Sequence, residues 1–179
     1  VHYLDILADM AGAKCTEIYS QTWNRPWSEF KGDPQSMTIM KFENGKRAFL
    51  EASAANAVEL YPWKDEFWRA ECQSGTLILD HRDLEAFHYD PTKSGNRLRR
   101  GQGINVPLIQ QNKWVHSWLI EKFVDWLDGG PEMETNIEDN LQSVALFSAA
   151  ILSSKTGQAV KVQEHLSAVR EKVKKEGLL

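Results

Sequence analysis

The sequence predicts an α+β fold in which an open, mostly antiparallel β-sheet carries helices packed on one of its faces. Three observations lead to this expectation. Short extended runs follow one another between residues 14 and 89 and are joined by hairpin turns. Amphipathic helical patterns precede these runs at residues 1–11 and follow them from residue 115 onward. Strands grouped together and followed by grouped helices are typical of α+β proteins.

The chain opens on a predicted helix followed by a strand. In residues 1–11, four apolar side chains recur at helical spacing, and Gly12 supplies a common helix stop. Residues 14–23 alternate between two faces as a strand does, until the Asn-Arg-Pro sequence at residues 24–26 ends the pattern. Ser20 is a polar interruption on the expected inner face of this strand.

Two hairpins are predicted next. Residues 36–42 and 46–57 are extended runs, and between them Asn44 and Gly45 form a pair that favours a tight primed turn. A second hairpin joins two further runs through a Gln-Ser-Gly turn, and one short strand follows it. These later runs lie at residues 66–72, 76–80 and 84–89.

Residues 90–111 form a long segment punctuated by Gly and Pro. A loop of about 20 residues without secondary structure is uncommon in a compact domain, and it is usually either functional or disordered. Arg97, Arg99 and Arg100 make the segment basic. The absence of aromatic residues between these arginines and the net negative charge of the chain argue against a phosphate or nucleic-acid site. A mobile lid beside the substrate is the preferred functional interpretation, and plain disorder is the alternative.

Two amphipathic helices are predicted after this loop, at residues 115–127 and 136–154. The apolar stripe of the first consists of Val115, Trp118, Leu119, Phe123, Trp126 and Leu127. The residues of the second that are available for burial are Ile137, Leu141, Val144, Ala145, Phe147, Ser148 and Leu152. Residues 159–162 predict a short closing strand, and residues 163–179 a charged helical tail.

Composition excludes several classes of protein. The chain has 179 residues, 42% of them hydrophobic, which suits one sizeable core. A net charge of -4 argues against a nucleic acid or an anionic membrane as the main partner. No apolar run approaches the about 18 residues of a spanning helix. Cys15 and Cys72 show neither a disulfide framework nor metal-ligand spacing, so we expect reduced core thiols and a cytoplasmic location.

Five stretches of the sequence resemble the C-terminal domain of the Gfo/Idh/MocA oxidoreductases, the family of glucose-fructose oxidoreductase and inositol dehydrogenase. Each stretch is common by itself, but the five occur in the order of the family and together span the chain to about residue 162. They are HYLDIL at 2–7 leading to Gly12, FENGK at 42–46, CQSGTL at 72–77, FVDWLDG at 123–129 and AAILSSKTGQAV at 149–160.

The resemblance implies a two-domain enzyme. Its N-terminal Rossmann domain would bind NAD or NADP, and residues 1–162 would be the C-terminal α/β domain, followed by the tail at 163–179. The sequence holds no strand that leads through Gly-x-Gly-x-x-Gly into a helix, and no Glu-Lys-Pro stretch; Gly101 and Gly103 lie in the long loop. We therefore expect no cofactor-binding residue in this chain, an N-terminal domain missing from it, and no activity of the chain alone.

His2 matches the catalytic histidine of the family. An unperturbed imidazole titrates near neutral pH and can exchange one proton with an alcohol while hydride leaves for the nicotinamide. Asp5 lies one turn further along, where it would either orient His2 or complement the positive end of the helix. The remaining histidines lack ligand spacing, so no metal site is expected.

Weaker candidates for substrate binding lie at residues 23–27. The faces of Trp23 and Trp27 suit the C–H faces of sugars, and packing in the core or at an interface is the equal alternative. Asn24 and Arg25 stand between them and would either bind substrate hydroxyls or a carboxylate, or form a solvated turn.

Taken together, these features predict the substrate-binding and oligomerisation domain of an NAD(P)-dependent oxidoreductase that acts on a sugar, cyclitol or related polyol-like compound. Large side chains alternate on both faces of the strands, as Ile18 with Tyr19 and Phe67 with Trp68, so we expect a homo-oligomer through the open sheet face. The alternative is a stand-alone, non-catalytic module of the same fold that binds a small ligand or serves as a scaffold.

Overall fold

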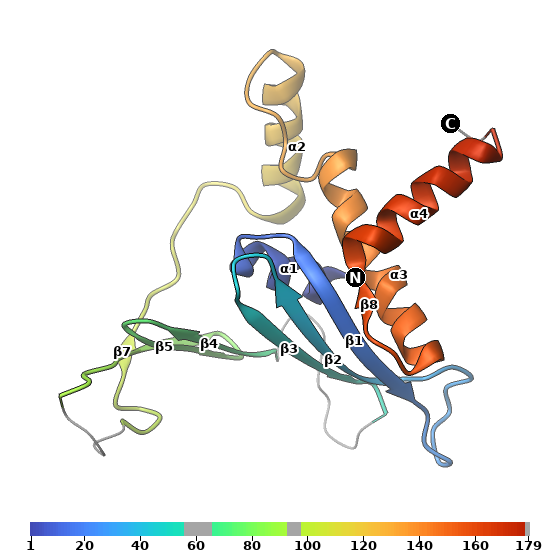
Figure 1. The fold of residues 1–179 in the computed structure, drawn as a ribbon. Coiled ribbons are helices and arrows are strands. Elements are labelled where there is room, and N and C mark those ends of the chain that lie inside the picture. Colours follow the sequence, from blue (N-terminus) through green and yellow to red (C-terminus); the bar gives the residue numbers. More distant parts are fainter. Residues whose placement is uncertain (56–65, 93–97, 178–179) are drawn as a thin grey trace. The chain divides into compact units, whose positions relative to one another are not determined.

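The chain folds into two compact units, each with its own antiparallel sheet. The structure is a computed structural model that describes residues 1–55, 66–92 and 98–177. One unit combines Val1–Ala55 with Leu119–Leu179, and the other is Asn56–Trp118. The described residues form four α-helices and two open four-stranded sheets (Figure 1). The predicted α+β class is confirmed, although the strands pair in two sheets where the hairpin pattern suggested one.

The first unit orders its strands as β3-β2-β1-β8 and adds helices to them. Its elements are α1 (His2–Ala11), β1 (Cys15–Trp23), β2 (Gln35–Phe42), β3 (Arg47–Ser53), α3 (Ile137–Thr156), β8 (Val160–Lys161) and α4 (Val162–Lys175). Helix α2 (Val115–Leu127) crosses the boundary between the units. Each of these elements was predicted within a few residues of its bounds; the end of the third predicted strand, residues 56–57, lies outside the described residues.

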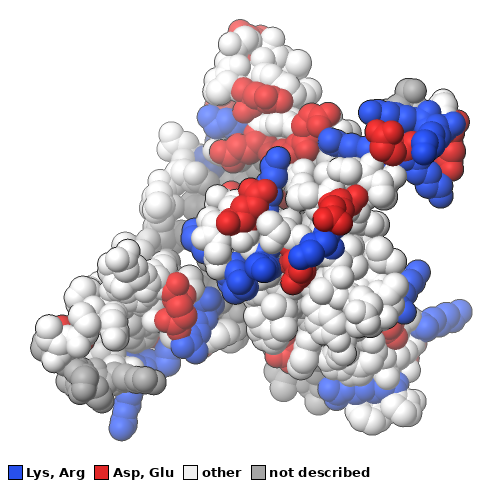
Figure 2. All heavy atoms as spheres, in the orientation of Figure 1, with Lys and Arg blue, Asp and Glu red and all other residues white. Residues whose placement is uncertain are grey.

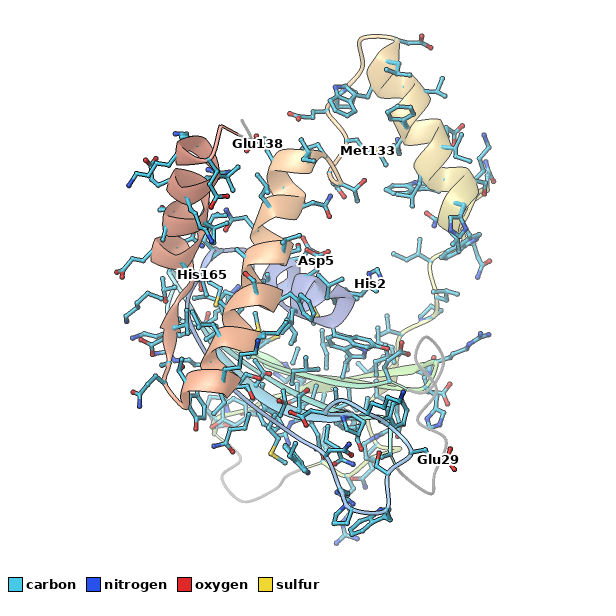
Figure 3. All side chains as sticks on the ribbon, turned by 90° about the vertical axis from the view of Figure 1, so that its right-hand side faces the viewer. His2, Asp5, Glu29, Met133, Glu138 and His165 are labelled. Carbon is cyan, nitrogen blue, oxygen red and sulfur yellow. The ribbon has the colours of Figure 1, made fainter. Side chains whose placement is uncertain are left out.

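Helices α1, α3 and α4 cover one face of the first sheet (Figures 1 and 3). Ile18, Met40 and Phe42 point from the strands into this layer and are almost fully buried. They meet Leu4 of α1 and Val162 of α4 in a single apolar cluster. Removing this apolar surface from water is the main favourable contribution to the stability of the unit.

Apart from Leu146, the side chains that α3 buries are small. Its buried residues are Ser143, Ala145, Leu146, Ala149, Ala150 and Ser153. Val144 is 55% exposed, and Ile137, Phe147 and Leu152 are exposed as well, so the predicted burial of these four side chains is wrong. Small side chains let the helix axis approach the strands closely, because no bulky group separates the two backbones.

The close approach of α3 also satisfies the open edge of β1. Strand β8 pairs with β1 only at Glu17 and Ile18. Beyond that point the Ser20 N–H donates to Ser153 Oγ at 2.9 Å, and Ser153 Oγ donates to the Gln158 carbonyl at 2.7 Å. Hydroxyl groups of the helix thus replace a missing neighbouring strand. The buried Ser20 hydroxyl itself pairs with Thr38 Oγ1 at 2.8 Å, so a polar side chain is tolerated on the inner face of β1.

The second unit pairs β4 (Phe67–Cys72), β5 (Gly75–Asp80), β6 (Asp83–His88) and β7 (Ile104–Asn105) in that order. Strand β7 lies inside the segment 90–111, which we expected to lack secondary structure. It pairs with Glu85 and Ala86 of β6. The described end of the predicted lid is therefore part of the sheet, whereas Arg97 lies outside the described residues.

Glu85 holds this loop in place. Its buried carboxylate accepts hydrogen bonds from Arg100 Nε at 2.9 Å, the Gly101 N–H at 2.9 Å and the Gly103 N–H at 3.2 Å. Arg100 also donates to Asp80 at 3.0 Å. The Arg100 guanidinium, followed by the two backbone amides, holds the pKa of Glu85 below its usual range.

Helix α4 carries an interleaved set of charges (Figure 2). Arg170 pairs with Glu138 of α3 at 3.3 Å, and Lys174 pairs with Glu171 at 3.4 Å. On its inner side, Gln163 donates to the Cys15 carbonyl at 3.1 Å. The residues that we predicted as a tail thus pack against α3 and β1.

We expect Ser153→Ala to lower the free energy of unfolding by about 1–3 kcal/mol, because it leaves the Ser20 N–H buried without an acceptor. Urea unfolding followed by circular dichroism measures this loss. The matched control is Ser167→Ala on α4, where an exposed hydroxyl donates to the Gln163 carbonyl; it should change stability by less than about 0.5 kcal/mol. Equal losses in the two variants would contradict the role of Ser153.

We also expect the stabilisation by Glu85 to depend on pH. The folded pKa of Glu85 is lowered from its ordinary 4.5, so the unfolded chain takes up the proton first as the pH falls. The stabilisation is therefore complete above 4.5 and disappears as the pH falls through the lower folded value. At neutral pH the melting temperature of the wild type should be higher than that of Glu85→Gln, and the two melting temperatures should converge in acid. Asp83→Asn, which removes an exposed carboxylate on β6, is the control. A difference in melting temperature between wild type and Glu85→Gln that stays the same at every pH would contradict this role of Glu85.

Candidate functional site

The first turn of α1 brings His2 and Asp5 to the same end of one helix (Figure 3). Both residues are exposed. The helix starts after Val1, whose carbonyl accepts the Asp5 N–H at 3.1 Å, and it ends at Gly12 in the left-handed conformation, with φ 65°. The short apolar repeat and the glycine stop that predicted this helix also set the one-turn spacing of the two side chains.

Asp5 has a partner on another helix. The hydroxyl of Ser143 in α3 donates a hydrogen bond to the Asp5 carboxylate. Ser143 itself is buried. Ser143 was not among the predicted site residues. Its only signal in the sequence is a serine among the small residues of α3, and this does not indicate which residue it contacts.

The residues at 23–27 occupy the connection between β1 and β2. Trp23 ends β1. The Asn24 side chain serves the loop itself: Nδ2 donates to the Phe30 carbonyl at 2.7 Å, and Oδ1 accepts the Arg25 N–H at 2.8 Å. The Arg25 guanidinium lies 5.5 Å from the ring centre of Trp27, which is 72% exposed. The loop therefore presents a stacked cation and aromatic ring to solvent.

The structure does not bring the two groups of predicted site residues together. Glu29 marks the β1–β2 loop in Figure 3, and it lies well away from His2 and Asp5. His2 offers an imidazole for proton exchange, whereas Arg25 and Trp27 offer a cation and an aromatic face for a carboxylate or a sugar ring.

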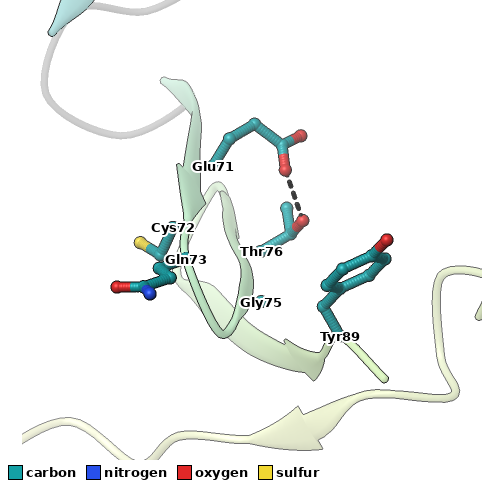
Figure 4. Close-up of a pocket in the computed structure, with 6 residues that line it drawn as sticks. All are labelled: Glu71, Cys72, Gln73, Gly75, Thr76 and Tyr89. Carbon is teal, nitrogen blue, oxygen red and sulfur yellow. Dashed lines mark hydrogen bonds between the residues drawn. The ribbon is translucent and has the colours of Figure 1, made fainter. Parts of the chain in front are cut away.

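The second unit has a shallow depression of about 260 Å³ beside the β4–β5 turn (Figure 4). Glu71, on its rim, accepts hydrogen bonds from Thr76 Oγ1 at 2.6 Å and Arg69 Nε at 2.5 Å. Thr76 first and Arg69 second hold the pKa of Glu71 below its usual range, so the carboxylate is an acceptor and a poor base. The residues that line the depression are Glu71, Cys72, Gln73, Gly75, Thr76 and Tyr89.

The two cysteines have different environments. Cys15 is buried, and burial raises the pKa of its thiol. Cys72 is exposed at the end of β4, so the expectation of a core thiol is wrong there.

Within residues 1–55, 66–92 and 98–177, no cluster of three or more His, Cys, Asp or Glu side chains has the arrangement of a metal site. Among the helices described there, none is both long and apolar enough to span a bilayer. In the basic loop, the Gly101 and Gly103 amides and the Arg100 guanidinium bind Glu85.

One curated protein closely resembles the chain in sequence. No family model matches the sequence. The uncharacterized protein y4oX of Sinorhizobium fredii is 49% identical over 170 residues, which cover 95% of this chain and 47% of that protein. The chain thus spans about half the length of the curated relative it matches.

Solved oxidoreductases share the fold. A putative NADPH-dependent oxidoreductase of Desulfitobacterium hafniense matches with a TM-score of 0.73 and 18% identity over 92% of this chain and 47% of its own. An oxidoreductase of Agrobacterium radiobacter, solved with NAD⁺, L-tartaric acid and magnesium, matches with a TM-score of 0.70 and 20% identity over 91% and 47%. The aldose-aldose oxidoreductase of Caulobacter crescentus, solved with glycerol, matches with a TM-score of 0.69 and 14% identity over 89% and 45%.

These structures align with nearly all of this chain and with about half of each oxidoreductase. Their sequence identities are low, so the likeness is one of fold. It agrees with the five sequence stretches that resemble the family. The chain therefore has the fold of the C-terminal domain of the Gfo/Idh/MocA-type oxidoreductases.

Proposed function

We propose that the chain is the substrate-binding and oligomerisation domain of an NAD(P)-dependent oxidoreductase that acts on a sugar, cyclitol or related polyol-like compound. The observation that carries the proposal is the match of nearly the whole chain to about half of each of several oxidoreductases. One of these was solved with L-tartaric acid and another with glycerol, both of them polyhydroxy compounds. These ligands support a hydroxyl-bearing substrate for this chain.

NAD or NADP would be bound mainly by an N-terminal Rossmann domain. We propose this domain as the partner of the present chain. The chain spans 47% of its Sinorhizobium relative, which leaves room in that protein for a second domain. A bound nicotinamide would supply the hydride acceptor. In this chain no described glycine-rich turn leads from a strand into a helix, so we assign it no part of the cofactor site.

His2 is the proposed catalytic residue. Its imidazole would hydrogen-bond the reacting hydroxyl and take up the hydroxyl proton as the C–H hydride departs, which leaves a carbonyl product. The exposed position of His2 in the first turn of α1 supports this role. Asp5, Trp23, Asn24, Arg25 and Trp27 remain weaker candidates for substrate contacts.

The open face of the first sheet is the proposed homo-oligomer interface. The strand register aligns Tyr19 with Ile39 and Ile39 with Phe49, so three large side chains form one row across β1, β2 and β3. Ile39 is 52% exposed and Phe49 60% exposed. Such a row on the face opposite the helices is typical of a surface that a partner covers. The same row also suits the alternative function, a stand-alone scaffold, and the cytoplasm is the location proposed for either.

Reading the coding sequence immediately upstream of the Val1 codon separates the two functions. A strand with Gly-x-Gly-x-x-Gly followed by Glu-Lys-Pro would support the oxidoreductase. A start codon at or just before Val1 would contradict it and favour the scaffold.

In the polypeptide that includes the cofactor domain, we expect His2→Ala to lower turnover at least about a hundredfold without weakening cofactor binding. The reason is the loss of the group that accepts the hydroxyl proton. Nicotinamide absorbance would follow the oxidation of a panel of sugars, cyclitols and sugar acids by NAD⁺ and NADP⁺. His88→Ala, an exposed histidine on β6, is the control; turnover equal in the two variants would remove His2 from the mechanism.

We expect Phe49→Glu to dissociate the oligomer, because it places a charge in the middle of the apolar row. A central anchor of an interface contributes about 2 kcal/mol or more, so the subunits should associate at least roughly thirtyfold more weakly. Sedimentation velocity over a range of concentrations measures this change. Phe30→Glu makes the same substitution at an exposed aromatic of the β1–β2 loop and should leave the oligomer intact. An oligomer insensitive to Phe49→Glu would rule out the open face.

A further inference from the structure

We infer that Ser143 is a positioning residue for His2: its hydrogen bond to Asp5 sets the orientation of the first turn of α1. The catalytic part of this inference rests on the proposed function of His2. The structural part rests on the hydrogen bond between Ser143 and Asp5 and on the one-turn spacing of Asp5 and His2.

Ser143 is buried, so its hydroxyl needs a hydrogen-bond partner inside the protein. Ser143 is 5% exposed, and Leu146 and Ala150, which lie within about 60° of it around the helix axis, are buried as well. A hydroxyl moved from water into an apolar layer is unfavourable unless it finds a partner. Here the partner is a carboxylate, and hydrogen bonds to ionised groups are stronger than those between neutral groups.

The two buried serines of α3 have different partners. Ser153 bonds to the backbone of Ser20 and of Gln158, so it holds a strand edge and the end of its own helix. Ser143 bonds to a side chain of another helix. Its bond can therefore fix how α1 lies on α3, which a backbone bond within the sheet cannot do.

The hydrogen bond from Ser143 adds a directional contact to the apolar packing of α1. Leu4 and Ala11 anchor one face in the core. Apolar contacts are non-directional, whereas a hydrogen bond has preferred distances and angles. At 3.6 residues per turn, side chains three apart differ by about 60° around the helix. Fixing Asp5 against Ser143 therefore restricts the direction in which the Cα–Cβ bond of His2 projects.

The test follows the NMR signals of the His2 imidazole nitrogens. Two-bond ¹H–¹⁵N NMR spectra of the chain report the tautomer and the titration of each histidine ring. Ser143→Ala should shift the His2 ring signals several-fold more than those of His165. Ser148→Ala is the matched control, since Ser148 lies on the same helix with its hydroxyl 2.9 Å from His165 Nε2; it should do the reverse.

Three further variants keep the test decisive. Ser143→Thr retains the hydroxyl and should restore the His2 signals. Asp5→Ala removes the same hydrogen bond by changing its exposed partner, so no buried side chain is altered. It replaces Ser143→Ala in the test if Ser143→Ala does not fold. The double variant should match Asp5→Ala alone, because both changes break one bond. A folded Ser143→Ala with unaltered His2 signals, or additive effects in the double variant, would overturn the inference.

Turnover separates this inference from the proposed function. In the polypeptide with its cofactor domain, Ser143→Ala should lower kcat roughly tenfold or more, with KM for NAD⁺ unchanged. Loss of turnover in Ser143→Ala together with unchanged His2 ring signals would count against positioning. Full turnover in His2→Ala would contradict the proposed function, while the ring signals would still decide whether Ser143 orients His2.

Discussion

The close packing of α3 on β1 is the contact on which the first unit depends. It is possible because the buried side of α3 consists of Ala and Ser residues with a single Leu. At this short separation the Ser153 and Ser154 hydroxyls reach the backbone N–H groups of Ser20 and Thr22, which β8 is too short to pair. The same helix then holds α1 through Ser143 and α4 through the Ser148 and His165 pair.

The second unit relies on a buried carboxylate in a comparable way. Glu85 binds the Arg100 guanidinium and two backbone amides, and so holds the described part of a loop rich in Gly and Arg. These contacts change the interpretation of the loop as a source of free positive charge. Arg100 is neutralised within the unit by Glu85 and Asp80, and the described glycine amides bind a side chain of the same unit. A run of basic residues in a sequence thus does not measure the charge available to a ligand.

The candidate site was predictable in part. His2 and Asp5 share a face because helical spacing is a local property, and both the resemblance to the oxidoreductases and the helix pattern pointed to this turn. Ser143 was not predictable, since it lies 138 positions away and is one serine among several on α3. Residues 23–27 were grouped with His2 from their chemistry alone, and the fold keeps that loop apart from α1 (Figure 3).

The sequence by itself determined the local elements of this protein. The Asn44-Gly45 turn, the glycine stops at Gly12 and Gly157 and the Asn136 cap each act within a few residues, so their signals survive without tertiary context. The tertiary structure decided which face of α3 is buried, which strands share a sheet, and which partners Asp5 and Glu85 take. These outcomes depend on how closely distant elements approach one another, and a hydrophobic periodicity that rewards large side chains does not show where small ones permit closer contact.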